Sequence, residues 1–448
     1  MAAATFTACS NEDGVENGKQ ESVDGFYMTL SMVGGTQAQT RTKQNNEEKA
    51  TPEESKITTG VLYLYDGAIK VFQKDITEAD WASQPGENKP GTSNPIKVSV
   101  NNVTENKDYN VYFLANTTAN DPLTATITDY AGASAANKFV MFNQNDPSVG
   151  GGSYTVTFTA DNKSKDKAAK VSAPIKVERV VARIDAPTAE PTEITVKEGV
   201  TDEEKAAAED AKAKIKSITY QGYALGNLAK KSNLEQKWSG DVLQMPKDMT
   251  YDKAYSTYGT VTEVGADVAF GTDVKNYLFE NTTPVVKYAT TMYFKYKALL
   301  KSPSTELTDG TFYRYDGVVY SNLADIIKSA NTNPFGKTAD ELLKMLDKDG
   351  DKVIDAPEKE ISDFRTAYNI EVYERGEVYY RLPVQDKFYS TQYSILRNSI
   401  YQLNVKNIYN LGFDVPNGED NKKPNYYMEV QVQVNPWVLN AYDVNLGE

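Results

Sequence analysis

The sequence contains no histidine among its 448 residues. Histidine is the commonest general base in enzymes and a frequent zinc ligand, and Ser-His and Cys-His nucleophile pairs require it. Carboxylate or lysine chemistry remains open, for example in a hydrolase with paired carboxylates, but no such pair stands out. We therefore expect that the chain is not an enzyme and that it requires no cofactor.

The only cysteine is Cys9, so no intramolecular disulfide can form. A short apolar run ending in Ala8 precedes it and acidic residues follow, a pattern typical of lipoprotein signals, and we predict lipidation at Cys9. The run is shorter than a complete signal, so we expect a truncated start. The alternative is an incidental cysteine in a frayed terminus. Elsewhere no apolar stretch approaches the ~20 residues of a membrane span, so only the precursor's lipid would contact a membrane.

The chain is strongly acidic, with a formal net charge of −14. It therefore lacks a basic surface for nucleic acid, and an anionic membrane would repel it. Its length predicts two to three domains, and its 30 tyrosines favour strands over helices.

Two segments near opposite ends of the chain alternate apolar and polar residues, as strands with one buried face do. The first is Phe26–Met32, and Arg41, the first arginine of the chain, follows it after a flexible stretch. The second is Met428–Val434. A removable strand, a cleavage point and a terminal strand able to replace it are what a self-assembling subunit needs.

Between these segments, short strand patterns are separated by Gly, Pro, Asn and Asp, which is typical of β-sandwiches. Asp66-Gly67 predicts a hairpin turn. Thr201 and Glu204 form a capping-box pattern ahead of an Ala/Glu/Lys-rich run, which predicts a helix over about 201–216, and a second helical insertion is expected over about 321–370. The predicted strands are 61–65, 68–72, 96–100, 109–114, 154–158, 175–184, 372–384, 399–405 and 426–434.

With these pieces in order, the chain resembles the fimbrillins of the Bacteroidales type V pilus, and is most similar to shaft-forming major subunits. The resemblance rests on segments at both ends of the chain and in its middle. They are Ala8-Cys9, the early strand before Arg41, Ile175-Lys-Val-Glu-Arg179-Val-Val-Ala-Arg183, Arg397-Asn-Ser-Ile-Tyr401-Gln-Leu-Asn-Val405 and Val432-Gln-Val-Asn-Pro436-Trp437-Val438-Leu-Asn-Ala-Tyr442-Asp443.

The resemblance implies a mainly β fold of two transthyretin-like sandwiches, the second with the helical insertions. It also implies a lipidated, outer-membrane-anchored precursor that a surface protease cleaves after Arg41, leaving Thr42 first and a net charge of −11. The expected partners are further copies of the chain, tip and anchor subunits and the protease, in fimbriae serving adhesion or biofilm formation. The predicted divisions are 1–41 (signal remnant and propeptide), 42–174 (first sandwich), 175–448 (second sandwich) and 426–448 (donor region).

In this scheme the donor strand fills a groove in the next subunit with Met428, Val430, Val432 and Val434. Burying four such side chains contributes roughly 6–12 kcal/mol before ordering costs. The alternative is that 426–434 is an ordinary strand of its own domain and that the last few residues, or none, act as donor.

A second pattern predicts a calcium loop. Carboxylates occupy positions 1, 3, 5, 9 and 12 of an EF-hand spacing, and Val353 stands where a backbone carbonyl serves. Lys352 replaces the usual glycine at position 6, which costs roughly 1–2 kcal/mol. The alternative is a solvated acidic loop. The candidate ligands are Asp347, Asp349, Asp351, Val353, Asp355 and Glu358.

A different class of function remains open, that of a non-polymerising surface lipoprotein that binds glycans. Exposed tryptophans would stack on sugars, although each is more often a core residue. The candidates are Trp81, Trp238 and Trp437.

Overall fold

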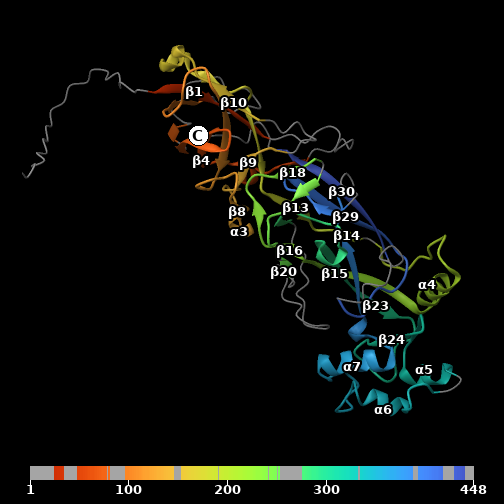
Figure 1. The fold of residues 1–448 in the computed structure, drawn as a ribbon. Coiled ribbons are helices and arrows are strands. Elements are labelled where there is room, and N and C mark those ends of the chain that lie inside the picture. Colours follow the sequence, from red (N-terminus) through yellow and green to blue (C-terminus); the bar gives the residue numbers. More distant parts are fainter. Residues whose placement is uncertain are drawn as a thin grey trace, which may run out of the picture.

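The computed structural model is elongated, with strands at one end and a helical lobe at the other (Figure 1). Its buried apolar residues form three clusters along this length. The structure describes residues 25–34, 48–77, 79–80, 96–145, 153–189, 191–240, 242–249, 251–252, 275–330, 333–386, 392–416 and 428–438.

The N-terminal unit consists of two sheets that share one apolar core, as in a sandwich. The small sheet has the order β11-β1-β6 and the large one β2-β12-β9-β7-β4-β5, with β10 on β7. Its strands are β1 (Phe26–Leu30), β2 (Met32–Gly34), β4 (Thr59–Asp66), β5 (Ile69–Thr77), β6 (Ile96–Val100), β7 (Asp108–Ala115), β9 (Met141–Asn143), β10 (Thr155–Thr157), β11 (Ala169–Lys170) and β12 (Ile175–Arg179).

The C-terminal unit repeats this plan around a second core. One sheet has the order β21-β13-β29-β30-β3, with β14 on β29, and the other β15-β23-β27. Its strands are β3 (Glu48–Lys49), β13 (Val181–Asp185), β14 (Thr188–Ala189), β15 (Ile215–Gly226), β21 (Lys275–Phe279), β23 (Thr291–Leu300), β27 (Glu377–Pro383), β29 (Ser399–Ile408) and β30 (Met428–Val438).

A helical lobe extends from the second unit and has its own core. It combines the sheet β25-β24-β26 with three short helices, and α4 (Asp202–Lys214) lies beside β25 (Figure 1). The lobe comprises β24 (Phe312–Tyr315), β25 (Val318–Tyr320), α5 (Leu323–Ser329), α6 (Ala339–Leu343), α7 (Glu358–Tyr368) and β26 (Glu371–Tyr373).

Smaller elements connect these units. They are α1 (Pro52–Ser55), β8 (Thr126–Ile127), α3 (Tyr130–Ala133), β16 (Leu228–Ala229), β17 (Ser232–Asn233), β18 (Lys237–Ser239), β19 (Val242–Gln244), β20 (Tyr251–Asp252), β22 (Asn281–Thr283) and β28 (Tyr393–Ile395).

The mainly β fold and both helical insertions are confirmed. The capping box predicted at Thr201 and Glu204 is formed at the start of α4, and Gly67 has the positive φ (59°) that the predicted hairpin turn needs. By its pairing with β9, strand β12 belongs to the N-terminal sheet, whereas the predicted second sandwich begins at Ile175. Strands β15, β21 and β23 were not predicted.

Gly376 lies just before β27 and allows the backbone there to approach β23 closely. It has φ 77°, and a Cβ atom there would lie 2.3 Å from the carbonyl oxygen of Ala298 in β23. Gly336 has a similar φ of 63°, but its Cβ would meet nothing within 4 Å. An alanine would therefore be strained by the left-handed backbone at both positions, but only at Gly376 would its Cβ also clash with a neighbour.

We predict that Gly376→Ala lowers the free energy of unfolding by about 3 kcal/mol, because left-handed strain adds to the clash with Ala298. Gly336→Ala, the matched control, should cost about 1 kcal/mol. Urea denaturation of both variants measures the difference. Equal losses would show that the close approach at Gly376 is unimportant.

Candidate functional site

Strand β1 occupies the centre of the small N-terminal sheet. It runs antiparallel to β6 and parallel to β11, and Met28 lies opposite both Val98 and Ala169. Phe26, Met28 and Leu30 are buried, whereas Tyr27 and Thr29 between them are half-buried. The alternation predicted for this segment is therefore confirmed, and its apolar face points into the core.

The same segment crosses to the large sheet within two residues. The Ser31 carbonyl oxygen accepts a hydrogen bond from the Ile175 amide (2.9 Å), and β2 then pairs in parallel with β12. Met32, in β2, is also fully buried. Residues 26–34 thus tie both layers of the sandwich together, and their loss would leave β6, β11 and β12 with unpaired backbone groups beside an apolar groove.

Strand β30 pairs along β29 in antiparallel register, with a bulge between Val405 and Asn407. Val432 lies opposite Leu403 and Val434 opposite Tyr401, and both partners are buried. At its far end β30 also pairs in parallel with β3 through Trp437 and Val438. The four proposed donor residues therefore lie in a sheet of their own subunit, and residues 439–448 fall outside the described part of the chain.

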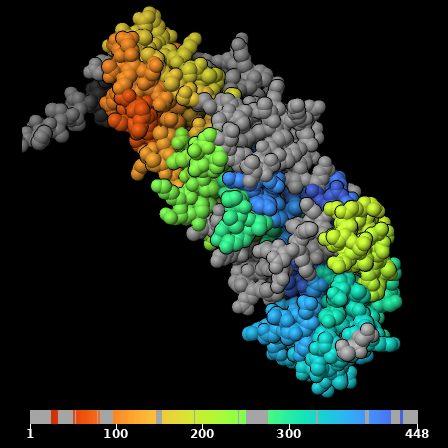
Figure 2. Space-filling model, turned by 45° about the vertical axis from the view of Figure 1, so that its right-hand side comes forward, coloured from red at the N-terminus to blue at the C-terminus, as the bar shows by residue number. Residues whose placement is uncertain are grey.

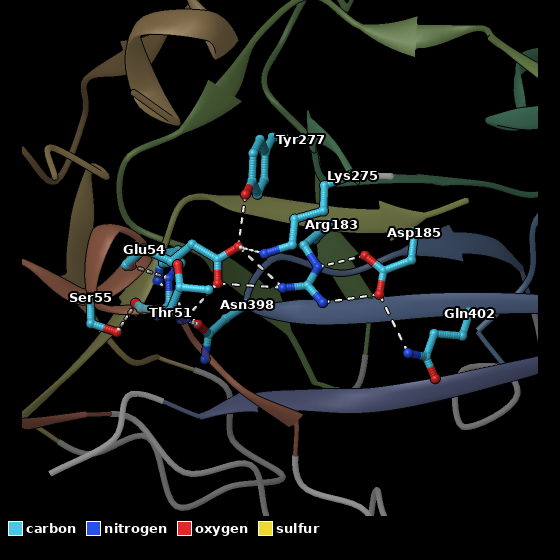
Figure 3. Close-up of polar contacts among 10 residues, drawn as sticks. Thr51, Glu54, Ser55, Arg183, Asp185, Lys275, Tyr277, Asn398 and Gln402 are labelled. Carbon is cyan, nitrogen blue, oxygen red and sulfur yellow. Dashed lines mark hydrogen bonds and ion pairs between the residues drawn. The ribbon is translucent and has the colours of Figure 1, made fainter. Parts of the chain in front are cut away.

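A buried carboxylate joins the start of the N-terminal unit to the C-terminal sheet (Figure 3). Glu54, in α1, is 2% exposed. Its Oε1 accepts hydrogen bonds from Tyr277 Oη (2.7 Å) and Lys275 Nζ (2.9 Å) of β21, and it lies 3.1 Å from Arg183 Nη1 of β13. The Thr51 amide donates to Oε2 at 2.8 Å.

Burial by itself would raise the pKa of Glu54, but these donors outweigh it. The hydrogen bonds from Thr51, Tyr277 and Lys275, together with the charge of Arg183, lower the pKa of Glu54 to about 2. The carboxylate is therefore ionised throughout the physiological range and links its cationic partners across the junction.

Arg179 strengthens the same junction from β12. It is fully buried, its Nε donates to the Glu54 carbonyl oxygen (2.8 Å), and its Nη1 donates to Asn398 Oδ1 (3.0 Å). Arg179, Arg183 and Asn398 belong to segments that carried the resemblance, and the structure brings them together at the junction, where Figure 3 shows Arg183 and Asn398 beside Glu54.

A second buried ion pair also lies on the side of the C-terminal unit that faces the N-terminal unit, beside β17, which pairs with β8. Arg397 Nη2 is 2.6 Å from Glu280 Oε1, and both side chains are almost fully buried. Arg397 Nη1 also donates to the carbonyl oxygen of Leu234 (2.8 Å). This pair holds the segment 228–244 against the sheet. The pair was not predicted, because nothing in the local sequence pattern identifies Glu280 as the partner of Arg397.

The acidic loop brings the first three predicted ligands together. Oxygens of Asp347, Asp349 and Asp351 lie within 4.8 Å of one another. Asp347 Oδ1 and Oδ2 accept hydrogen bonds from the Gly350 and Lys352 amides (2.8 and 3.1 Å). Lys352 adopts the left-handed conformation expected of position 6, with φ 70°.

The last two predicted carboxylates have other partners. Asp355 Oδ1 accepts a hydrogen bond from the Lys348 amide (2.7 Å), and Glu358 Oε1 accepts one from Arg365 Nη1 (2.9 Å). Burial raises the pKa of Glu358 to about 7, against the lowering effect of Arg365. Ile354 packs into the lobe's core, as its apolar position in the loop suggests.

Several other predicted residues lie outside the described part of the chain, namely Cys9, Arg41, Thr42 and Trp81. Trp238 is half-buried, and its Nε1 donates to Gln236 Oε1 (3.0 Å). Trp437 is placed through its backbone alone, in β30. Among the described helices, none is both long and apolar enough to cross a membrane.

The geometry defines a two-unit β protein in which a single N-terminal segment completes both sheets of the first unit. Residues 371–443 match the family model described as major fimbrial subunit protein type IV, fimbrillin, C-terminal. The resemblance to fimbrillins is confirmed over this segment, which runs from β26 through β30. No curated protein matches the chain.

Solved structures of proteins from Porphyromonas gingivalis and Parabacteroides distasonis also match the chain along most of its length. Fimbrilin from Porphyromonas gingivalis is 17% identical, with a TM-score of 0.43, and the match covers 92% of this chain and 98% of fimbrilin. A proposed cell adhesion protein from Parabacteroides distasonis is 13% identical, with a TM-score of 0.46 and coverage of 93% and 100%. These TM-scores are low, so the architecture described above rests on the strand pairings of this chain.

We predict that Glu54→Gln lowers the free energy of unfolding at neutral pH by about 3 kcal/mol, because Lys275 loses a charged partner and Arg183 loses one of its two carboxylates, both at a buried site. The folded-state pKa of Glu54 lies below its ordinary value of 4.5. Its stabilising contribution is therefore complete above about pH 5 and declines as the pH falls towards 2. The variant should lack this part of the acid sensitivity.

The exposed neighbour Glu53 provides the control, since Glu53→Gln should change stability by less than about 0.5 kcal/mol. Urea denaturation between about pH 2 and 7 gives both curves. Parallel curves for wild type and Glu54→Gln would contradict the role of this carboxylate.

Proposed function

We propose that the chain is a pilin, a structural subunit of a cell-surface fimbria. The observation that carries the proposal is the segment 26–34, which completes both sheets, buries Phe26, Met28, Leu30 and Met32, and precedes the polar sequence that contains Arg41. The match of residues 371–443 to fimbrillins supports it. In this function the precursor would be exported as a lipoprotein that is lipidated at Cys9, and the assembled fimbria would serve adhesion or biofilm formation.

Assembly would begin with cleavage after Arg41. The first strand would then be held only by non-covalent contacts, and its departure would open the groove bounded by β6, β11 and β12. An incoming strand that keeps both pairings of β1 must run in the direction of β1, because β6 is antiparallel and β11 parallel to it. It must also supply apolar side chains at every second position, as Phe26, Met28, Leu30 and Met32 do.

The C-terminal region 426–448 would supply that strand. Met428, Val430, Val432 and Val434 have the required spacing, but using them would break the pairing of β30 with β29. Residues 439–448 also alternate, through Tyr442, Val444 and Leu446, and using them would leave β30 in place. We therefore place the donor within 426–448 and favour its last ten residues.

Copies of this chain would be the main partners, with tip and anchor subunits completing the fibre. The alternation of apolar and polar residues in the C-terminal segment favours a shaft subunit over a tip subunit, because a tip subunit need not donate a strand. The processing protease would cleave after arginine.

Limited trypsin digestion of the full chain tests the proposal. We predict a new N-terminus at Thr42 and a ladder of oligomers that resist denaturant on an unboiled gel, because strand exchange dissociates slowly. Because trypsin also cleaves after Lys43, the control is the double variant Arg41→Ala with Lys43→Ala, which should remain monomeric under the same treatment. Cleavage that leaves only monomer would contradict a shaft-forming subunit.

Two truncations locate the donor after cleavage. A chain ending at Asn425 should fail to polymerise if any part of 426–448 donates. A chain ending at Val438 should also fail if the last ten residues donate, and should polymerise if β30 does. Oligomers formed by the chain ending at Asn425 would rule out C-terminal exchange.

We also propose that the acidic loop of the helical lobe binds calcium weakly. The clustered oxygens of Asp347, Asp349 and Asp351 support this, since calcium prefers oxygen ligands. Val353 would contribute its carbonyl oxygen. Glu358 would have to leave Arg365, and Asp355 would have to leave the Lys348 amide or bind through water, so we expect a dissociation constant of about 10⁻⁴–10⁻³ M.

Lys352→Gly tests this site, because glycine removes the left-handed strain at position 6. We predict calcium binding that is about ten-fold tighter, corresponding to about 1–2 kcal/mol. Asp349→Ala should abolish binding, whereas Asp363→Ala, on the exposed face of α7, should leave it unchanged. Calorimetry without a calcium signal at millimolar concentration in both wild type and Lys352→Gly would refute the site.

A further inference from the structure

A pocket of about 340 Å³ lies where α4 meets the helical lobe, at the end of β23. Figure 2 shows the yellow-green α4 packed against this lobe. Apart from Leu300, its lining residues come from outside the sandwich strands. They are Ala213, Lys214, Leu300, Lys301, Ser302, Val319, Tyr320, Ser321 and Asp325.

Lys214 fastens α4 to β25 at the edge of the pocket. Its ammonium lies 2.7 Å from Asp210 Oδ1, donates to the Val319 carbonyl oxygen (2.6 Å) and stands 5.2 Å from the centroid of the Tyr320 ring. Asp210 Oδ2 in turn accepts a hydrogen bond from the Val319 amide (2.8 Å). These contacts fix the pocket's wall before any ligand enters, which reduces the ordering cost of binding.

The side chain of Lys301 caps the C-terminal end of α4. Its ammonium donates to the carbonyl oxygens of Lys212 (3.1 Å) and Ala213 (2.9 Å). An ammonium has three N–H donors, so these two bonds leave one donor for a ligand.

The remaining polar groups offer both acceptors and donors. Asp325 is exposed, and its Oδ2 accepts a hydrogen bond from Asn322 Nδ2 (3.1 Å), which leaves acceptor capacity on the carboxylate. Ser302 and Ser321 add hydroxyls, and Leu300 and the Tyr320 ring add apolar surface. The charges of Lys214 and Lys301 are balanced by Asp210 and Asp325.

We propose that this pocket binds one residue of a neutral saccharide. A sugar ring presents hydroxyls that donate and accept hydrogen bonds, together with C–H faces that pack on apolar surface. The pocket supplies hydrogen-bond acceptors, hydrogen-bond donors and apolar surface to match them. The balanced charge gives no preference to an anion or a cation. The volume lies at the lower end of the ~300–1,000 Å³ typical of ligand pockets and suits a single ring. The proposal does not depend on strand exchange, because the pocket lies within one subunit.

Ligand-observed saturation-transfer NMR on the uncleaved full chain tests the proposal, using methyl glycosides of glucose, galactose, mannose and N-acetylglucosamine. Methyl glucuronide is the anionic comparison. We expect at least one neutral glycoside to bind with a dissociation constant near about 1 mM, more tightly than the glucuronide. Asp325→Ala should weaken that binding at least about ten-fold, because a charge-assisted hydrogen bond is lost.

Asp340→Ala is the matched control, since Asp340 is also an exposed carboxylate in the first turn of a short helix, α6, and does not line the pocket. Its binding should equal that of the wild type. Three results would each overturn the proposal: no neutral glycoside bound, tighter binding of the glucuronide, or equal binding by Asp325→Ala and wild type. Because the uncleaved monomer is used, a failure of polymerisation leaves the result interpretable.

Discussion

The buried carboxylate of Glu54 holds the two units of this protein in register. It receives hydrogen bonds from Lys275 and Tyr277 of β21 and the charge of Arg183 of β13, while Arg179 holds the backbone carbonyl of the same residue. Glu54 follows Arg41 in the chain, so cleavage there removes nothing that the junction uses. Under the proposed cleavage, the first strand would leave while the junction keeps the N-terminal unit attached to the C-terminal sheet.

The sequence predicted those parts of the fold that local patterns determine. The alternation over Phe26–Met32, the hairpin turn at Gly67 and the capping box at Thr201 all depend on neighbours within a few residues, and each is present. Strand β15 was missed because bulges near Ser217 and Gly222 shift its register, which erases the period of two that identifies a strand.

Long-range partners could not be predicted in the same way. Glu54 and Arg183 are separated by 129 positions, and Arg397 and Glu280 by 117, so no spacing rule connects them. The acidic loop shows the same limit at close range. Its spacing predicted that Asp347, Asp349 and Asp351 lie together, and their oxygens do, but it could not show that Arg365, about two turns further along α7, engages Glu358.

The covalent link at Arg41 would decide which strand occupies the groove. While β1 belongs to the same chain, its effective concentration at the groove is far higher than that of a strand from another subunit. The proposed cleavage would turn this internal partner into a free peptide that dilutes away. A donor strand on a neighbouring subunit would then compete through its contacts alone. The apolar positions vacated by Phe26, Met28, Leu30 and Met32 would favour any strand with the same alternation. The order of events would thus follow from the position of the peptide bond after Arg41, which lies between the strand β1 that is released and the junction at Glu54 that remains.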